Sequence, residues 1–210
     1  MGRALTITAS PWWLFVTLAS TIVALAPVVS AGSVTHYPDA DIVEEWTPST
    51  GTDNYALIDE AGDPDLTDYV RSSEIGAQEA YRVAISTSVP ADSIVDSIVL
   101  VIHAKKTSAL PSLPRIKLSL LDSATTTYSQ SANVTLTATA TTYTKSWATN
   151  PFTTEAWTVD EANATRYRIG VRQYASDITE TVYQLNKVVY YHAETPAATG
   201  PVQSVIGGVD

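Results

Sequence analysis

The stretch TVYQLNKVVYYH, residues 181–192, decides the fold class of this chain. It is dominated by β-branched and aromatic residues, which are the residues that strands prefer. Successive side chains of a strand point to opposite faces, so an alternating pattern separates two faces of a sheet. The run is therefore predicted to be a long strand. One face would carry Tyr183, Leu185, Val189 and Tyr191, and the other Val182, Val188 and Tyr190.

The same alternation recurs along the chain. It is clearest at residues 81–85, 98–103, 115–120, 134–140 and 166–172. Turn-forming sequences rich in Pro, Gly, Asn and Asp separate these runs. The single helix candidate is Trp157–Ala162, with Thr158 as its N-cap. About eight strands with almost no helix predict an all-β fold, a two-sheet, jelly-roll-like antiparallel sandwich with one short helix.

Composition excludes several classes of function. The chain has 210 residues, a formal net charge of −10 and no cysteine. The excess of acidic residues argues against a nucleic-acid partner, because such binders concentrate Lys and Arg. A chain without cysteine forms no disulfide, no thiolate metal site and no cysteine nucleophile. No catalytic or phosphate-binding motif occurs, so we expect a protein that is not an enzyme and needs no cofactor, calcium apart.

The first 31 residues differ from the rest. Arg3 is the only charged side chain before Asp39, and an apolar run from Pro11 ends in Val29-Ser30-Ala31. This pattern predicts a secretory signal peptide over residues 1–31 and a secreted or surface location. The alternative is an uncleaved N-terminal anchor, which would be the chain's only contact with a membrane.

Charge is distributed unevenly along the rest of the chain. No Lys or Arg lies between Arg3 and Arg71, whereas ten acidic residues do. We therefore predict an acidic N-terminal arm over 32–54, a β-sandwich domain over 55–193 and a flexible tail over 194–210. Either residues 33–37 or 42–46, or the tail near Val202, would be able to add a strand to a neighbouring copy.

One acidic turn suggests a metal site. Asp63, Asp65 and Asp68 place carboxylates close together in the sequence, and calcium prefers six to eight oxygen ligands. The turn does not match an EF-hand, because Asp68 stands where that loop needs glycine. A calcium site on a sandwich loop and a solvated acidic turn are the two interpretations.

Two further sets of residues are candidate sites. Asn133 and Asn163 begin N-x-T sequons and are the expected glycosylation sites of an exported chain. Arg166, Arg168 and Arg172 alternate along one strand and so share a face. They are the expected interface with the acidic residues Glu44 and Glu45, either between copies or within one chain.

Several segments together resemble a known module. They are DADIVEEWTPSTG (39–51), YALIDE (55–60), DLTDYVRS (65–72), AWT (156–158), RIGVR (168–172) and VYQLNKVVY (182–190). They look like the jelly-roll β-sandwich of tailed-phage structural proteins and related microbial surface proteins. In outline the chain is also similar to secreted carbohydrate-binding sandwiches. The resemblance implies a two-sheet sandwich with an assembly or display role and no catalysis.

Together these observations favour an exported, non-enzymatic structural protein. It would bind other copies of itself and assemble into a filament, sheath or coat. One alternative is a carbohydrate-binding module that recognises cell-surface glycans through exposed Trp or Tyr. Another is a virion structural or decoration protein. The residues Trp46, Trp147 and Trp157 are candidates for such a sugar platform, although in a sandwich of this size they more often belong to the core.

Overall fold

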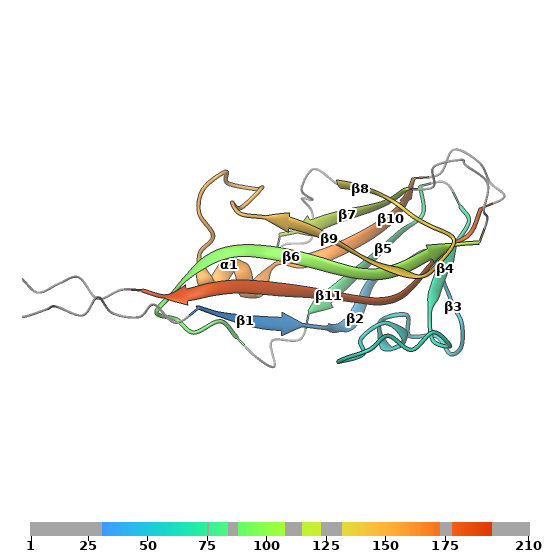
Figure 1. The fold of residues 1–210 in the computed structure, drawn as a ribbon, viewed down its shortest axis with the longest axis horizontal. Coiled ribbons are helices and arrows are strands. Elements are labelled where there is room, and N and C mark those ends of the chain that lie inside the picture. The colour runs from blue at the N-terminus through green and yellow to red at the C-terminus, as the bar shows by residue number, and fades with distance from the viewer. Residues whose placement is uncertain are drawn as a thin grey trace, which may run out of the picture.

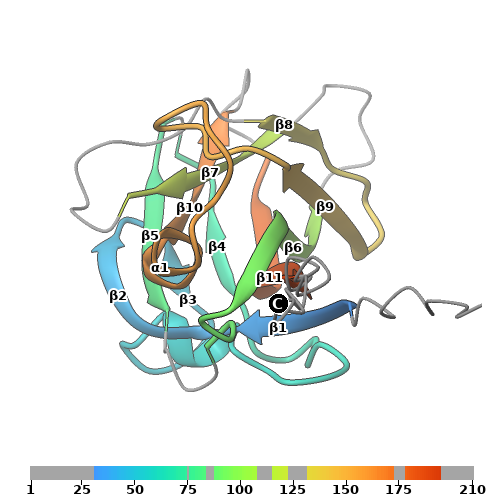
Figure 2. The same ribbon diagram turned by 90° about the vertical axis from the view of Figure 1, so that its left-hand side faces the viewer.

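The computed structural model describes residues 31–74, 76–83, 88–107, 115–122, 132–172 and 178–194. Two antiparallel sheets stack face to face, and the chain's one α-helix in these ranges lies at one end (Figures 1 and 2). The predicted fold class, an all-β sandwich of two antiparallel sheets with one short helix, is confirmed.

The first sheet is built around its longest strand. β11 (Glu180–Ala193) pairs on one side with β6 (Ser93–Lys106), and β6 pairs with the edge strand β9 (Thr141–Trp147). On its other side β11 pairs with β1 (Ala31–His36) near one end and with β4 (Val70–Ser72) near the other. The two-residue strand β3 (Thr47–Pro48) pairs with β4.

The second sheet has the order β2-β5-β10-β7-β8. Its strands are β2 (Pro38–Glu44), β5 (Gln78–Val83), β10 (Arg166–Arg172), β7 (Arg115–Leu121) and β8 (Ala132–Thr135). With β1-β11-β6-β9 facing β5-β10-β7-β8, the strand order is that of a jelly roll.

The apolar residues of the alternating strands pack between the two sheets and form the core. On β6, Ile98, Leu100 and Ile102 are fully buried, and on β7 Ile116, Leu118 and Leu120 meet them. Two tyrosines, Tyr81 and Tyr167, are also fully buried, with their ring centroids 6.1 Å apart. The apolar residues that recur every second position thus form one continuous core.

The helix α1 (Val159–Ala164) begins directly after Thr158, two residues later than the predicted range Trp157–Ala162. Thr158 is the N-cap, and with Glu161 it forms a reciprocal capping box. At the other end of the helix, the fully buried Lys187 donates from Nζ to the carbonyls of Ala162, Asn163 and Thr165. Burial lowers the pKa of Lys187 to about 7. A short 3-10 helix, η1 (Tyr55–Leu57), precedes the long loop to β4.

One expectation about domain boundaries is wrong. Residues 32–54 are not an arm outside the sandwich, because β1, β2 and β3 are hydrogen-bonded strands of its two sheets. For the same reason, segments 33–37 and 42–46 are largely occupied in pairing within their own chain. Strand β9 was not expected, since TTYTKSW places few large apolar residues on its inner face. Residues 1–30 and 195–210, which include most of the leader and the tail, lie outside the described residues.

Candidate functional site

A bulge in β11 builds the most distinctive surface feature of the chain. The register with β6 shifts between Val182 and Gln184. Val182 and Leu185 therefore both face the core, whereas Tyr183 is excluded from the core cluster and lies beside His103 on the outer face. The expectation that Tyr183 shares a face with Leu185 is wrong, because an extra residue in one strand re-aims its side chain.

Tyr183 is the centre of a cluster of rings and cations. Its ring lies 5.8 Å from that of Tyr69 and 6.2 Å from that of His103, in both cases edge to face. The Lys105 Nζ lies 5.1 Å from the Tyr183 ring centroid, and the Arg71 Cζ lies 6.0 Å from the Tyr69 centroid. These are cation–π distances. Partial burial lowers the pKa of His103, which favours its neutral form.

The sheet register explains how the two cations come together. Thr181 pairs with Arg71 of β4 on one side and with Lys105 of β6 on the other. The three residues therefore form a row across adjacent strands on the outer face of the first sheet. Because neighbouring strands are about 4.8 Å apart, the backbones that carry the two cations are separated by roughly 10 Å.

The loop before β4 brings Tyr69 to this row. Gln184 donates from Nε2 to the carbonyls of Glu60 and Gly62, at 2.7 and 2.9 Å. Further along the loop, Ser49 and Tyr69 are joined by two hydrogen bonds. The loop is thereby held against β11, so the position of Tyr69 depends on contacts far apart in the sequence.

Two cavities meet at this row and share Arg71 and Thr179. The first, about 340 Å³, is the acidic section, and its other lining residues are Glu45, Thr47, Ser72, Ser73 and Glu74. The second, about 250 Å³, is the aromatic section, which is also lined by Leu66, Tyr69, Lys105, Thr107, Thr181 and Tyr183. We refer to both sections together as the Arg71 groove.

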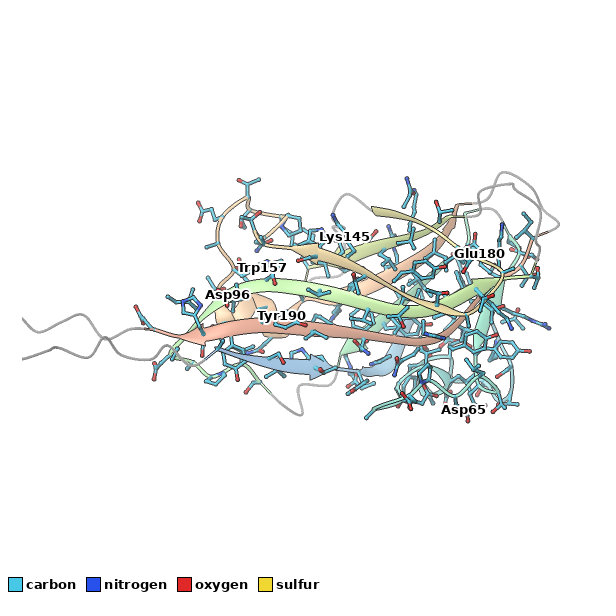
Figure 3. The ribbon with its side chains drawn as sticks, viewed as in Figure 1. Asp65, Asp96, Lys145, Trp157, Glu180 and Tyr190 are labelled. Atoms are coloured by element: carbon cyan, nitrogen blue, oxygen red, sulfur yellow. The ribbon has the colours of Figure 1, made fainter. Side chains whose placement is uncertain are left out.

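An unusual carboxyl group lies beneath the groove. Glu180 is fully buried, and within the described part of the chain neither of its carboxylate oxygens has a hydrogen-bond partner. It pairs in register with Ser72, which lines the acidic section, and with Lys106. Burial raises the pKa of Glu180 to about 8. Figure 3 shows Glu180 at the β4 end of β11, far from Tyr190 and Asp96.

The structure does not bring Asp63, Asp65 and Asp68 together as a metal site. No group of three or more His, Asp or Glu side chains in the described ranges is placed to hold a metal ion. The exposed Asp65 instead accepts hydrogen bonds from the backbone N–H and the hydroxyl of Thr67, which lower its pKa. The turn thus has the geometry of a solvated Asx turn, the second interpretation of the sequence.

The structure describes the side chains of four of the five residues of the expected charged interface. Arg166 and Arg168 lie on one face of β10, half-buried, while Tyr167 and Ile169 between and after them are fully buried. The side chain of Arg172 lies outside the described residues. Glu44 and Glu45 are exposed at the end of β2 and just beyond it.

One acidic residue of the N-terminal segment does pair with a basic residue of the same chain. Asp39 of β2 accepts two hydrogen bonds from Arg82 of β5, at 3.0 and 3.1 Å. Asp39 of the acidic segment therefore forms an ion pair with Arg82 within one molecule, although Arg82 is not one of the arginines expected at the interface.

The two sequons differ in their surroundings. Asn133 lies exposed on the edge strand β8. Asn163 is half-buried in α1, where its side-chain oxygen accepts a hydrogen bond from the Val89 N–H. Only Asn133 is presented to solvent without such a bond in the described part of the chain.

The three tryptophans named from the sequence belong to the core. Trp46, Trp147 and Trp157 are 4%, 9% and 5% exposed, so they offer no sugar platform. Sequence reasoning missed the Arg71 groove itself. Arg71, Lys105 and Tyr183 come from three strands that are distant in the chain, β4, β6 and β11. No local sequence pattern marks the bulge in β11 that places Tyr183 beside the two cations.

No family model matches the chain, and no curated protein does either. Among solved structures, the chain is similar to the C-terminal CBM6 of LamC, a marine laminarinase from Zobellia galactanivorans. The identity is 7% over 75% of this chain and 98% of that one, with a TM-score of 0.41. A CBM4 structure has 9% identity over 78% and 95% of the two chains, with a TM-score of 0.36. Both neighbours are carbohydrate-binding modules. With TM-scores below 0.5, they assign this chain no function.

Among the described residues, no helix has the length and apolar character needed to cross a membrane.

Proposed function

We propose that this chain is a non-catalytic module that binds a carbohydrate in the Arg71 groove. The observation that carries the proposal is the mixed lining of the groove. Tyr69 and the 56% exposed Leu66 supply apolar surface, and Ser, Thr and charged side chains surround them. A sugar ring needs this combination, since it has apolar C–H faces and a rim of hydroxyl groups.

The lining also favours binding over chemistry. Tyr183 is 2% exposed and supports the site from beneath, while Tyr69 is the ring that lies partly open to solvent. Six Ser and Thr hydroxyls line the two sections and are able to donate and accept hydrogen bonds. No histidine lines either cavity in the described part of the chain, and the two glutamates of the acidic section are exposed.

The experiment is a binding titration with a panel of soluble oligosaccharides and polysaccharides, followed by calorimetry. The variant Tyr69→Ala should weaken binding by about tenfold or more, because it removes the apolar ring. The matched control is Tyr190→Ala, since Tyr190 is 46% exposed on the same strand as Tyr183 but lies outside the groove. Thermal melting checks that both variants are folded.

Two results would contradict this proposal. One is the absence of binding to every glycan at millimolar concentration. The other is an equal loss of affinity in Tyr69→Ala and Tyr190→Ala, which would locate the site elsewhere. Self-assembly into a surface structure stays a prediction, and light scattering at increasing protein concentration tests it directly.

A further inference from the structure

Resting on the proposed carbohydrate site, we infer that the aromatic section binds the anionic group of an acidic glycan. The anion would be a uronate carboxylate or a sulfate ester, held between Arg71 and Lys105. This inference names the ligand class that the Arg71 groove prefers over neutral sugars of the same backbone.

The charge of the aromatic section is opposite to that of the whole chain. The chain has 22 acidic and 12 basic residues. In the described part of the structure, however, both charged residues that line this section are basic, namely Arg71 and Lys105. The net charge of −10 disfavours the approach of anions, whereas the two cations of this cavity of about 250 Å³ attract them.

Neither cation is neutralised by the described part of the chain. The salt bridges found there join Arg82 to Asp39 and His192 to Asp96, and neither involves Arg71 or Lys105. Aromatic faces hold these cations instead: Lys105 lies over Tyr183, and Arg71 lies near Tyr69. A ring stabilises a cation through its quadrupole but leaves the full positive charge available to a ligand.

The arrangement around the cations fits an acidic sugar better than a free inorganic anion. Thr107, Thr179 and Thr181 line the same section and supply hydroxyls for the ring hydroxyls of a sugar. A guanidinium also binds a carboxylate or sulfate with two parallel hydrogen bonds, and such charge-assisted bonds are stronger than neutral ones. Lys105 gives the clearer test of anion binding, because it lines only the aromatic section. Arg71 also lines the acidic section, together with Glu45 and Glu74.

The test uses pairs of polymers with the same sugar backbone, one acidic and one neutral in each pair. Polygalacturonate and its fully methyl-esterified form compare a carboxylate with a neutral ester. Dextran sulfate and dextran compare a sulfate with a hydroxyl. Affinity is measured by calorimetry with the full chain at 50 and 300 mM salt. We expect at least about tenfold tighter binding to one acidic polymer than to its neutral partner, weakening at the higher salt.

Variants locate the effect in the groove. Lys105→Gln should reduce affinity for the acidic polymer about five- to tenfold and affinity for the neutral polymer by a clearly smaller factor, and Arg71→Gln should act in the same direction. The matched control is Lys145→Gln, because Lys145 also lies over a ring, with its Nζ 5.6 Å from the Trp147 centroid, but outside the groove. This control should stay within about twofold of the parent protein.

The outcomes separate this inference from the proposed function. Equal binding of charged and neutral polymers, abolished by Tyr69→Ala, would overturn the inference and leave the carbohydrate site intact. Binding to none of these four polymers would overturn the inference, and the wider glycan panel then decides whether the carbohydrate site stands. An acidic preference that falls equally in Lys105→Gln and Lys145→Gln would indicate non-specific attraction to scattered basic side chains, and would also overturn the inference. The two polymer pairs identify whether carboxylate or sulfate is the preferred anion.

Discussion

Replacement of Glu180 by glutamine should change how the stability of the chain depends on pH. Burial without a hydrogen-bond partner raises the pKa of Glu180 from 4.5 to about 8. The folded protein therefore retains this proton at pH values where the unfolded chain has already lost it. Below the unfolded pKa, the contribution of this residue to the free energy of unfolding is therefore fully present and does not change with pH. It decreases as the pH rises from the unfolded pKa to the folded pKa, and levels off above it.

The magnitude follows from the two pKa values. A difference of roughly 3.5 pH units corresponds to about 5 kcal/mol of unfolding free energy. Between pH 5 and 8 the parent protein should lose about 1.4 kcal/mol per pH unit from this residue. Glu180→Gln cannot ionise, so its advantage over the parent should grow with that slope and level off above pH 8.

The assay is urea unfolding at half-unit pH intervals from 5 to 9. Fluorescence reports unfolding, because Trp46, Trp147 and Trp157 are buried in the folded state. The difference between variant and parent removes the contributions of all other groups. Glu155→Gln, at an exposed position, is the control and should run parallel to the parent. A difference for Glu180→Gln that is constant across this pH range would refute the reasoning.

Three further changes test the fold and the surface. Lys187→Ala should lower the free energy of unfolding by at least about 3 kcal/mol, because three carbonyls at the end of α1 lose their donor; urea unfolding measures this. Thr158→Ala should cost about 1 kcal/mol, since it removes the capping box, and a result near zero in the same assay would contradict the role of the cap. When the chain is secreted from a glycosylating host, mass spectrometry should find glycan at Asn133 and none at Asn163, whose side chain bonds the Val89 backbone.

Local patterns predicted the elements that have strong periodicity. The long strands at 98–103, 115–120, 166–172 and 181–192 are all found, because a buried inner face requires an apolar residue at every second position. Thr158 was recognised as the helix cap for a similar reason, since the exposed N–H groups of a helix start need a nearby side-chain acceptor.

Weakly patterned strands were missed. β1 and β2 were predicted to be an acidic arm because they carry few large apolar residues. In the structure β1 is hydrogen-bonded to β11 and β2 to β5. Pairing of this kind depends on the partner strand and leaves little trace in the local sequence. The calcium prediction at Asp63, Asp65 and Asp68 rested on closeness along the chain, which does not by itself make side chains converge, and no converging group is found among the described residues.

By itself, the amino-acid sequence determined that the chain folds as a disulfide-free β-sandwich with one capped helix, because side-chain alternation and capping act over a few residues. Only the tertiary structure decided where a ligand would bind. Arg71 and Lys105 are 34 positions apart in the sequence, and Thr181 lies between them in space. The bulge that turns Tyr183 out of the core is a property of strand register, which is set by the packing of the whole sheet and by no single segment.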